Sequence, residues 1–220
     1  MTVSVLIPTL NEADEIAASI QSAVDAGADE VIVADGGSTD PTVPIAEATG
    51  AHVIRASAGR GTQLRPAAEI ASGDYVLILH ADNRLHPSCL NELERSHAAW
   101  GGCWQRIDAG GVVYRALEYG NAMRIRTRGL VFGDQAMFIR RSLLTAIGGV
   151  PTVPLMEDVL LSRQLRRRHR PVLLNSPVQV DARRWQSRGV VGQTLRNWRI
   201  QIAHRWGADE RRLMQRYQRP

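Results

Sequence analysis

The stretch VIVADGGSTD at residues 31–40 places an apolar run directly before an Asp, two Gly, a Ser and a second Asp. The opening VSVLIPTLNE at residues 3–12 has the same form, because an apolar run leads into polar residues. Apolar runs of this length, bounded by turn-forming residues, predict two buried strands close together in the chain. Pro8 has no N–H with which to extend a sheet ladder, so we expect the first strand to end there.

Polar side chains follow both predicted strands. Asn11 and Glu12 come after the first strand, and Asp35 ends the second. In open α/β sheets, ligands bind outside the carboxyl ends of the strands, so these side chains are expected at one binding edge. A carboxylate there suits a ribose hydroxyl or a base N–H, and the pattern therefore predicts a nucleotide pocket. The alternative is that Asp35 and Ser38 only cap the following turn, because Asp, Gly and Ser are frequent turn formers.

The first hundred residues alternate between strand and helix patterns. Strands are expected at 3–8, 30–34, 51–55 and 74–79, and helices at 13–26, 41–49, 62–72 and 87–98. This order predicts an α/β fold with a parallel sheet and covering helices. The run YVLILH at 75–80 is almost entirely apolar, which favours a central strand covered on both faces. Asn11 is expected to cap the first helix.

The regular alternation breaks after Trp100, where residues 101–131 are rich in Gly and Arg. Beyond them, the sequence favours an apolar stretch at 136–139, a short helix at 142–147 and a helix at 157–168. The last part predicts amphipathic helices, since one helical face carries Val191, Leu195, Trp198, Ile202 and Trp206. We expect one domain over 1–185, with a nucleotide-binding half at 1–100 and an acceptor half at 101–185, and a helical extension at 186–220.

The 220-residue chain has a net charge of +5, and it contains no Lys, so its 27 Lys-plus-Arg residues are all Arg. Arg binds phosphate bidentately, so such a surface suits nucleotide diphosphates, acidic lipids or nucleic acid. Genome composition is an alternative cause of the bias. Cys89 and Cys103 lack the spacing of metal ligands, which favours structural cysteines in a reduced protein.

Membrane-spanning and secreted classes are not indicated. No apolar stretch approaches the roughly 20 residues of a membrane span, and no basic segment with an apolar core opens the chain as in a signal peptide. We therefore expect a soluble, cytoplasmic protein. Peripheral contact with the inner membrane face, through the arginine-flanked apolar stripe near the end of the chain, is the alternative that stays open.

His80 and Asp82 follow the strand expected at 74–79, and so are predicted to lie at the same sheet edge as Asp35. Mg²⁺ and Mn²⁺ commonly lie between one or two carboxylates and substrate phosphates, which makes Asp82 a candidate ligand. His80 is a candidate nitrogen ligand or ribose contact. The alternatives are a turn residue for Asp82 and a hydrogen-bonded core histidine for His80.

Glu157 and Asp158 are predicted to open a helix after a loop with two prolines. The helix dipole favours their ionised forms there. An ionised carboxylate at the rim of a pocket can act as a general base on an acceptor hydroxyl, whereas helix capping is the alternative.

Two arginines stand next to a tryptophan further along, at Arg183, Arg184 and Trp185. Their forked cations could hold a diphosphate leaving group and stabilise its departure. The alternative is a solvated surface on which the arginine stems pack against the aromatic ring.

Seven segments taken together resemble the family-2 glycosyltransferases. They are PTLNE at 8–12, ADGGSTD at 34–40, GRGTQ at 59–63, YVLILHAD at 75–82, GDQAMFIRR at 133–141, MEDVLLSRQL at 156–165 and ARRW at 182–185. The order matches from Val3 to about Tyr217, and the set is specific although no single segment is. The chain is similar to the short, soluble bacterial branch in which His-Ala-Asp stands in place of Asp-x-Asp.

The resemblance implies a GT-A fold with a mostly parallel central sheet flanked by helices. It also implies a UDP- or GDP-sugar donor, an Mn²⁺ or Mg²⁺ ion and inversion at the anomeric carbon, with an acceptor hydroxyl that it does not identify. Asp82 would hold the metal, and Asp158, with Glu157 beside it, would be the base. Gly133, Asp134 and Gln135 would line the sugar and acceptor side. The nucleotide pocket would contain Pro8, Asn11, Glu12, Asp35, Arg60, Gln63, His80, Arg183, Arg184 and Trp185.

Two other functions remain as alternatives. Sugar nucleotidyltransferases share a glycine-rich loop with Arg and Lys after the first strand. Here that position reads PTLNEADE, which contains neither Gly nor Lys, and this disfavours that class. A basic, non-enzymatic module for nucleic acid or an anionic membrane would agree with the net charge of +5. The aromatic residues, 5% of the chain, show no stacking pattern, and the acidic residues cluster at strand ends. We therefore expect no nucleic-acid partner.

Overall fold

The computed structural model describes residues 1–189 and 192. The strands are β1 (Val3–Thr9), β2 (Glu30–Asp35), β3 (His52–Arg55), β4 (Tyr75–Ile78), β5 (Asn83–Leu85), β6 (Trp100–Ile107), β7 (Phe138–Arg140) and β8 (Val172–Val180). The helices are α1 (Ile16–Asp25), α2 (Thr42–Ala48), α3 (Arg60–Ile70), α4 (Cys89–Ser96), α5 (Val112–Arg128), α6 (Arg141–Ala146), α7 (Glu157–Leu165) and α8 (Arg183–Arg188), with a 3-10 turn, η1 (Gly133–Gln135).

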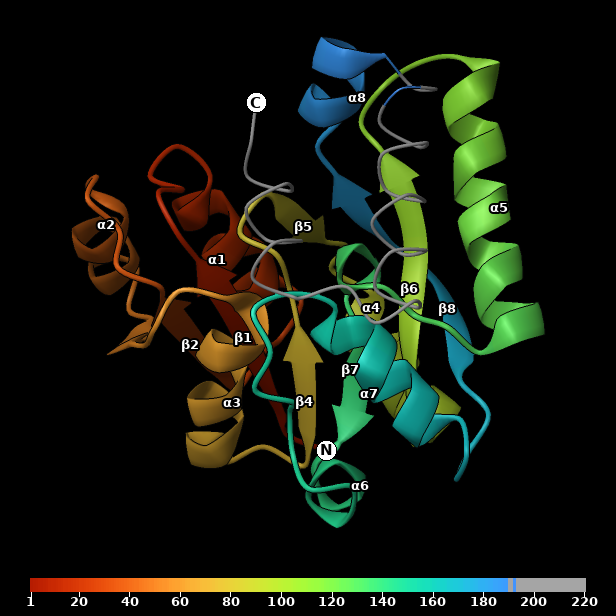
Figure 1. Cartoon of the computed structure of the whole chain (residues 1–220), viewed down its shortest axis with the longest axis horizontal. Helices are drawn as coiled ribbons and strands as arrows, with labels where there is room; N and C mark the ends of the chain where they lie inside the picture. Colours follow the sequence, from red (N-terminus) through yellow and green to blue (C-terminus); the bar gives the residue numbers. More distant parts are fainter. Residues whose placement is uncertain (190–191, 193–220) are drawn as a thin grey trace.

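These strands form one sheet in the order β3-β2-β1-β4-β7-β6-β8-β5 (Figure 1). β3, β2, β1 and β4 are mutually parallel, and β6 is parallel to β8. β7 runs antiparallel to both of its neighbours, and β5 runs antiparallel to β8. The predicted α/β class with a mostly parallel sheet is therefore confirmed. The sheet is continuous, because β4 of the first hundred residues pairs with β7 of the second half.

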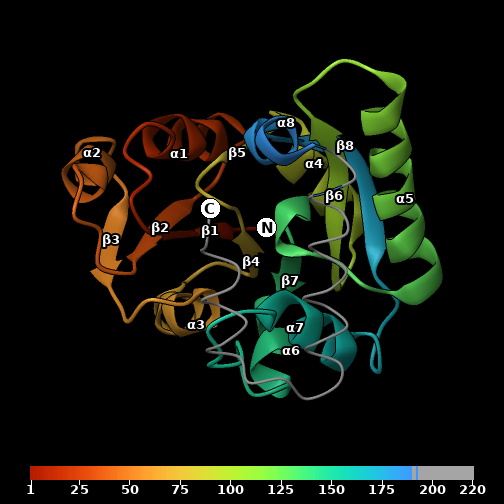
Figure 2. The same ribbon diagram turned by 45° about the horizontal axis from the view of Figure 1, so that its top comes forward.

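Helices cover both faces of the sheet (Figure 2). On one face, α1 and α4 pack on alternate strand residues such as Val5 and Leu77. On the other face, α3, α6 and α7 pack on the residues between them, such as Leu6 and Val76. β4 is buried along its whole length, which confirms the central strand that its apolar run predicted. Burial of both faces leaves the ends of the strands as the place where polar side chains gather.

The first strand and the first helix differ from their predicted limits. β1 continues through Pro8 to Thr9, because its pairing with β4 stops at Leu6 and Pro8 therefore interrupts no ladder there. The expected cap by Asn11 is wrong, because α1 begins at Ile16 without a side-chain cap. Asn11 instead adopts a positive φ of 55° and holds a neighbouring loop.

Residues 101–131, for which the sequence analysis predicted no element, lie largely in β6 and the long helix α5. Two glycines open β6, and a Cβ on Gly101 would lie 1.9 Å from the carbonyl oxygen of Val172 on β8. Gly101 therefore permits the close pairing of β6 with β8, whereas a Cβ on Gly102 would lie 2.6 Å from Cγ1 of Val131. In a sequence, a glycine pair indicates a break in a strand. Only the structure shows that another part of the backbone approaches closely at this point.

The expected helical extension at 186–220 lies mostly outside the described residues, and so do Trp198 and Trp206. Helix α8 crosses its expected start, because it runs from Arg183 to Arg188. Within residues 1–189 and 192, no helix has the length and the apolar character to span a bilayer. The division at residues 100 and 185 stays a prediction.

Candidate functional site

The carboxyl ends of β1, β2 and β4 lie at one edge of the sheet (Figure 1). Thr9, the last residue of β1, pairs with Asp35, the last residue of β2. β4 runs in the same direction beside β1, so the turn with His80 and Asp82 follows at this edge too. The parallel register therefore brings together the three chain segments that the sequence singled out.

Asp35 fixes the loop that follows β2. The residue is 2% exposed, and its carboxylate accepts hydrogen bonds from the N–H groups of Gly37, at 3.0 Å, and Ser38, at 3.1 Å. The amide oxygen of Asn11 accepts the N–H of Thr39 at 2.8 Å, which ties this loop to the one after β1. The turn-capping interpretation of Asp35 agrees with these contacts, and its contact with a nucleotide stays a prediction.

Gln63 joins α3 to the ends of two strands. Its amide nitrogen donates to the carbonyl oxygens of Thr9 and Ala34, at 2.8 and 2.7 Å, and its amide oxygen accepts the N–H of Gly59 at 3.2 Å. Both amide hydrogens are thus used inside the protein. In this arrangement Gln63 positions the start of α3, which carries Arg60, and its own contact with base or phosphates stays a prediction.

Arg60 and Glu157 form an ion pair, with 3.1 Å between Nε and Oε1. Glu157 is the first residue of α7, as the sequence predicted, and its side chain is 1% exposed. Burial raises the pKa of Glu157 to about 7; Arg60 acts against this increase, and Asp158 adds to it. Burial disfavours the charged form of a carboxyl group, so Glu157 can hold a proton near neutral pH.

The raised pKa of Glu157 should make the free energy of unfolding fall as the pH rises from about 4.5 to about 7. In that range the folded protein keeps a proton that the unfolded chain has released. The stabilisation is therefore complete below the ordinary pKa of 4.5 and is lost as the pH rises through the folded value. Glu157→Gln should remove this part of the pH dependence.

Urea unfolding at pH 5 and pH 7 measures the effect, with Glu69→Gln as a control because the Glu69 side chain is 62% exposed. Wild type and the control should lose stability between these pH values relative to Glu157→Gln. An identical pH dependence in Glu157→Gln and wild type would contradict the raised pKa.

Asp158, Gly133 and His80 meet at one point. The N–H of Gly133 donates to Oδ2 of Asp158 at 2.8 Å, and the N–H of Val159 donates to Oδ1 at 2.7 Å. A Cβ on Gly133 would lie 2.5 Å from Nε2 of His80 and 3.6 Å from Oδ2 of Asp158. The loop after β4, the turn η1 and the start of α7 are therefore in contact, and Asp158 is oriented by two backbone donors.

A buried polar network supports η1. Oδ2 of Asp134 accepts a hydrogen bond from Gln105 at 2.9 Å, and Gln105 is in turn bonded to Asn121. Arg124 donates to Asn121 at 2.7 Å and to Gln135 at 2.6 Å. Burial raises the pKa of Asp134, while the Arg124 charge lowers it. Two of the residues predicted for the acceptor side, Asp134 and Gln135, are thus held from β6 and α5.

Gln105, Asn121 and Arg124 were missed by the sequence analysis, because they lie in residues 101–131, where the regular alternation breaks and no element was predicted. The inner face of α5 is partly polar, so it gives a weak apolar periodicity. Four residues at helical spacing could have indicated that face, namely Glu118, Asn121, Ala122 and Ile125. Because the buried side of this helix carries polar residues, their spacing indicates a buried face only when the partners of those polar residues are known.

Asp82 can serve as a metal ligand. It is half-buried, and no described residue hydrogen-bonds to or pairs with its carboxylate. Within residues 1–189 and 192, no group of three or more His, Cys, Asp or Glu side chains could hold a metal by itself. An uncommitted carboxylate without further protein ligands fits a cation such as Mn²⁺ or Mg²⁺ that takes most of its ligands from substrate phosphates and water.

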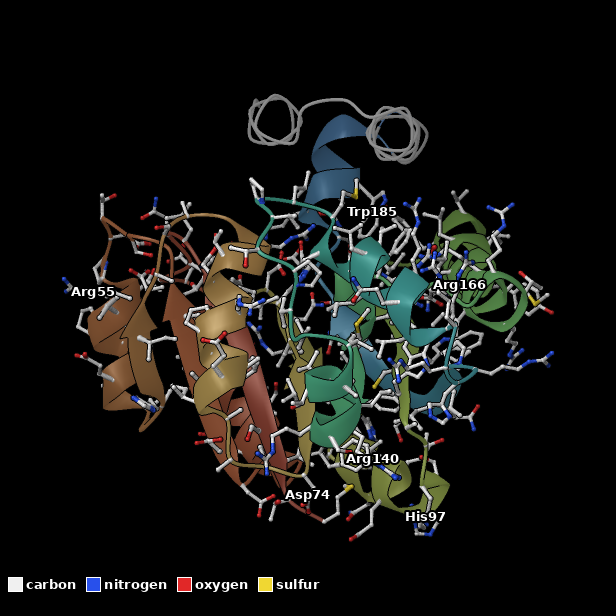
Figure 3. All side chains as sticks on the ribbon, turned by 60° about the horizontal axis from the view of Figure 1, so that its bottom comes forward. Arg55, Asp74, His97, Arg140, Arg166 and Trp185 are labelled. Carbon is white, nitrogen blue, oxygen red and sulfur yellow. The ribbon has the colours of Figure 1, made fainter. Side chains whose placement is uncertain are left out.

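Helix α8 lies over the carboxyl side of the sheet, as the position of Trp185 shows (Figure 3). Trp185 is partly buried against the core beneath α1. Arg183 forms ion pairs with Asp181 and with Glu15, the latter at 3.6 Å, and Glu15 also binds Arg84. Arg183 is therefore committed to carboxylates here, and the predicted contact of the Arg-Arg-Trp segment with a diphosphate stays a prediction.

The chain is similar to known glycosyltransferases. Residues 4–145 match the family described as Glycosyl transferase family 2. An 82-residue segment is 45% identical to the glycosyltransferase AglJ of Haloferax volcanii and covers 36% of this chain and 27% of that protein. A 93-residue segment is 39% identical to the glucosyl-3-phosphoglycerate synthase of Mycobacterium tuberculosis and covers 37% of this chain and 29% of that protein. These matches span less than a third of either relative.

Solved structures share the fold. The crystal structure of S. aureus TarS 1-349 has a TM-score of 0.66 at 20% identity, over 83% of this chain and 61% of that one. The glucosyl-3-phosphoglycerate synthase from Mycobacterium tuberculosis, in complex with Mn²⁺, UDP and glucosyl-3-phosphoglycerate, has a TM-score of 0.60 at 26% identity. That similarity covers 81% of this chain and 70% of the synthase chain. The α/β fold is therefore of the GT-A type.

Proposed function

The chain belongs to glycosyl transferase family 2, and on this premise we propose that it transfers a sugar from a nucleotide-diphosphate donor to an acceptor hydroxyl, with inversion at the anomeric carbon. One observation carries the proposal. The Arg60–Glu157 pair and the contact of Gly133 with His80 join the expected nucleotide side of the site to its expected acceptor side. A donor held at the strand ends would then have its sugar beside Asp158.

Asp158 is the proposed general base. Its two backbone hydrogen bonds fix the carboxylate, while each oxygen keeps a lone pair for an acceptor hydroxyl. As that hydroxyl attacks the anomeric carbon, its proton passes to Asp158 and a new carbon–oxygen bond forms. The bond from the anomeric carbon to the diphosphate breaks at the same time, and the nucleotide diphosphate leaves with the electron pair.

A divalent cation held by Asp82 would neutralise charge on the departing diphosphate. The uncommitted Asp82 carboxylate supports this assignment, and so does the crystal structure of the synthase, 26% identical, in complex with Mn²⁺ and UDP. The same relative has been solved with Mn²⁺ and UDP-glucose, at 27% identity. UDP is therefore the first nucleotide to test, ahead of GDP.

Calorimetric titration of UDP, with and without Mn²⁺, tests the binding half of the proposal. Asp35→Ala should weaken UDP binding by about tenfold or more whether or not metal is present, because a buried charged acceptor is lost. Asp82→Ala should remove only the part of the affinity that depends on Mn²⁺. Asp25→Ala is the control, since its exposed carboxylate ends α1 at the opposite edge of the sheet.

Asp35 also caps its own loop, so Asp35→Asn separates the two effects. The amide keeps an acceptor for the N–H groups of Gly37 and Ser38 and loses the charge. Equal UDP affinity in wild type, Asp35→Ala and Asp82→Ala, with Mn²⁺ present, would reject the assignment of the nucleotide pocket.

A further inference from the structure

A hollow lined by arginines lies on the flank of the molecule, between the end of α5 and α7. An open hollow of about 720 Å³ is lined there by Thr127, Arg128, Leu130, Arg163 and Arg166. Arg166 lies beside α5, to the right of Trp185 (Figure 3). Arg163 follows Glu157 by six residues, so it is displaced by roughly 9 Å along the axis of α7. The hollow is therefore separate from the site described above.

The charges around the hollow are unbalanced. Among the described residues, no acidic side chain lines it and none forms an ion pair with Arg128, Arg163 or Arg166. Nη1 of Arg166 donates a hydrogen bond to the carbonyl oxygen of Arg128, at 2.9 Å. Three like charges around one space repel each other, and an anion between them removes this cost. Guanidinium groups also match the oxygens of phosphate in pairs, which favours that class of anion.

The backbone holds these arginines in place. Gly129 ends α5 with a φ of 62°, and a Cβ there would lie 3.4 Å from Cβ of Arg166. Ser162 of α7 accepts the N–H of Val131 at 3.0 Å and donates to its carbonyl oxygen at 2.9 Å. The segment that leaves α5 is thus locked onto α7, and the arginines of both elements face the same hollow.

We propose that this hollow is a binding site for a phosphate group, borne either by a soluble compound or by a lipid headgroup. Its volume exceeds that of a phosphate ion, and Thr127 and Leu130 supply a hydroxyl and an apolar surface for the group that carries the phosphate. The segment from Leu130 to Gly133 connects the site to Asp158, because Gly133 donates to that carboxylate.

Inorganic phosphate is the first probe, and the readout is the rise in Tm with phosphate concentration at constant ionic strength. The double variant Arg163→Gln with Arg166→Gln should weaken the apparent phosphate affinity by about tenfold or more. Arg167→Gln with Arg170→Gln is the matched control. Both residues are exposed and lie outside the hollow, and the two substitutions remove the same charge as the first double variant does. The control should bind phosphate as wild type does.

Two further measurements keep the proposal falsifiable. Tungstate soaked into crystals of the wild-type protein should give density between Arg128, Arg163 and Arg166. If the double variant does not fold, Arg163→Gln alone tests the site. Equal loss of phosphate affinity in both double variants, or no tungstate in the hollow, would overturn the proposal.

Sedimentation with phosphatidic acid vesicles distinguishes the two sources of phosphate. Pelleting that requires Arg163 and Arg166, and that is absent with phosphatidylcholine, identifies a lipid headgroup. A phosphate-dependent rise in Tm without pelleting identifies a soluble phosphorylated ligand.

Discussion

Asp158→Asn is expected to reduce sugar transfer by roughly 100- to 10,000-fold and to leave nucleotide affinity close to that of wild type, because a general base acts in the transition state. Asp158 is 7% exposed, and its carboxylate is held by the N–H groups of Gly133 and Val159. An amide has the same shape and no basic lone pair of comparable strength. The variant therefore removes proton transfer and keeps the side chain in place.

The amide carries a cost in stability that must be measured. Both oxygens of Asp158 accept backbone hydrogen bonds, and an NH₂ group in place of one oxygen would face a donor. Loss of one such bond costs about 1–3 kcal/mol, so thermal unfolding should accompany the kinetics. If Asp158→Asn does not fold, Asp158→Glu keeps the charge and displaces it, and it should still depress turnover.

Glu157→Gln is the matched control, since it removes the neighbouring carboxyl group. Glu157 is paired with Arg60, so its loss should act mainly on the position of Arg60 and should be milder in turnover. Adjacent carboxyl groups can exchange roles, and the two variants must therefore be compared at several pH values. Near-normal transfer by a folded Asp158→Asn protein would remove the grounds for calling Asp158 the base.

Gly133→Ala is expected to depress transfer by about 100-fold, because a displacement of about 1 Å at a reacting centre can cost that much. The added Cβ would lie 2.5 Å from Nε2 of His80 and 3.6 Å from Oδ2 of Asp158. Carbon and nitrogen atoms that are not bonded do not approach so closely, so either the imidazole or η1 must move. The hydrogen bond from Gly133 to Asp158 depends on the position of η1.

Gly120→Ala is the control for this substitution. Gly120 lies in α5, and a Cβ there meets nothing within 4 Å. Because Ala favours a helix over Gly by about 1 kcal/mol, this variant should be slightly more stable than wild type and equally active. The kcat for sugar transfer and the UDP affinity are measured for Gly133→Ala, Gly120→Ala and wild type. Unchanged kcat in Gly133→Ala would show that the contact with His80 and Asp158 does not position the reacting groups.

Local sequence patterns predicted two of the boundaries near the site. β2 ends at Asp35 and α7 begins at Glu157, as expected, because each boundary depends on a short apolar run and on the residues beside it. The burial of β4 on both faces also followed from its run of apolar residues. These features are local, so neighbours in sequence contain the information that specifies them.

Contacts between distant segments could not be predicted in this way. The capping expected of Asn11 is replaced by a hydrogen bond to Thr39, and β6 forms at Gly101 because β8 approaches there. Each outcome depends on a partner that is remote in sequence. Local propensity is a weak prior, and tertiary context overrides it where a closer or better-satisfied contact exists.

By itself the sequence determined the alternation of strands and helices, the polar residues at the strand ends and the acidic start of α7. Only the tertiary structure decided that Glu157 pairs with Arg60, that Gly133 lies against His80, and that Gln105 and Arg124 support η1. The physical reason is that a strand end is specified by nearby residues, whereas a buried polar contact requires two partners. Burial penalises a polar group without a partner, so the packed sheet and helices select which distant side chains meet.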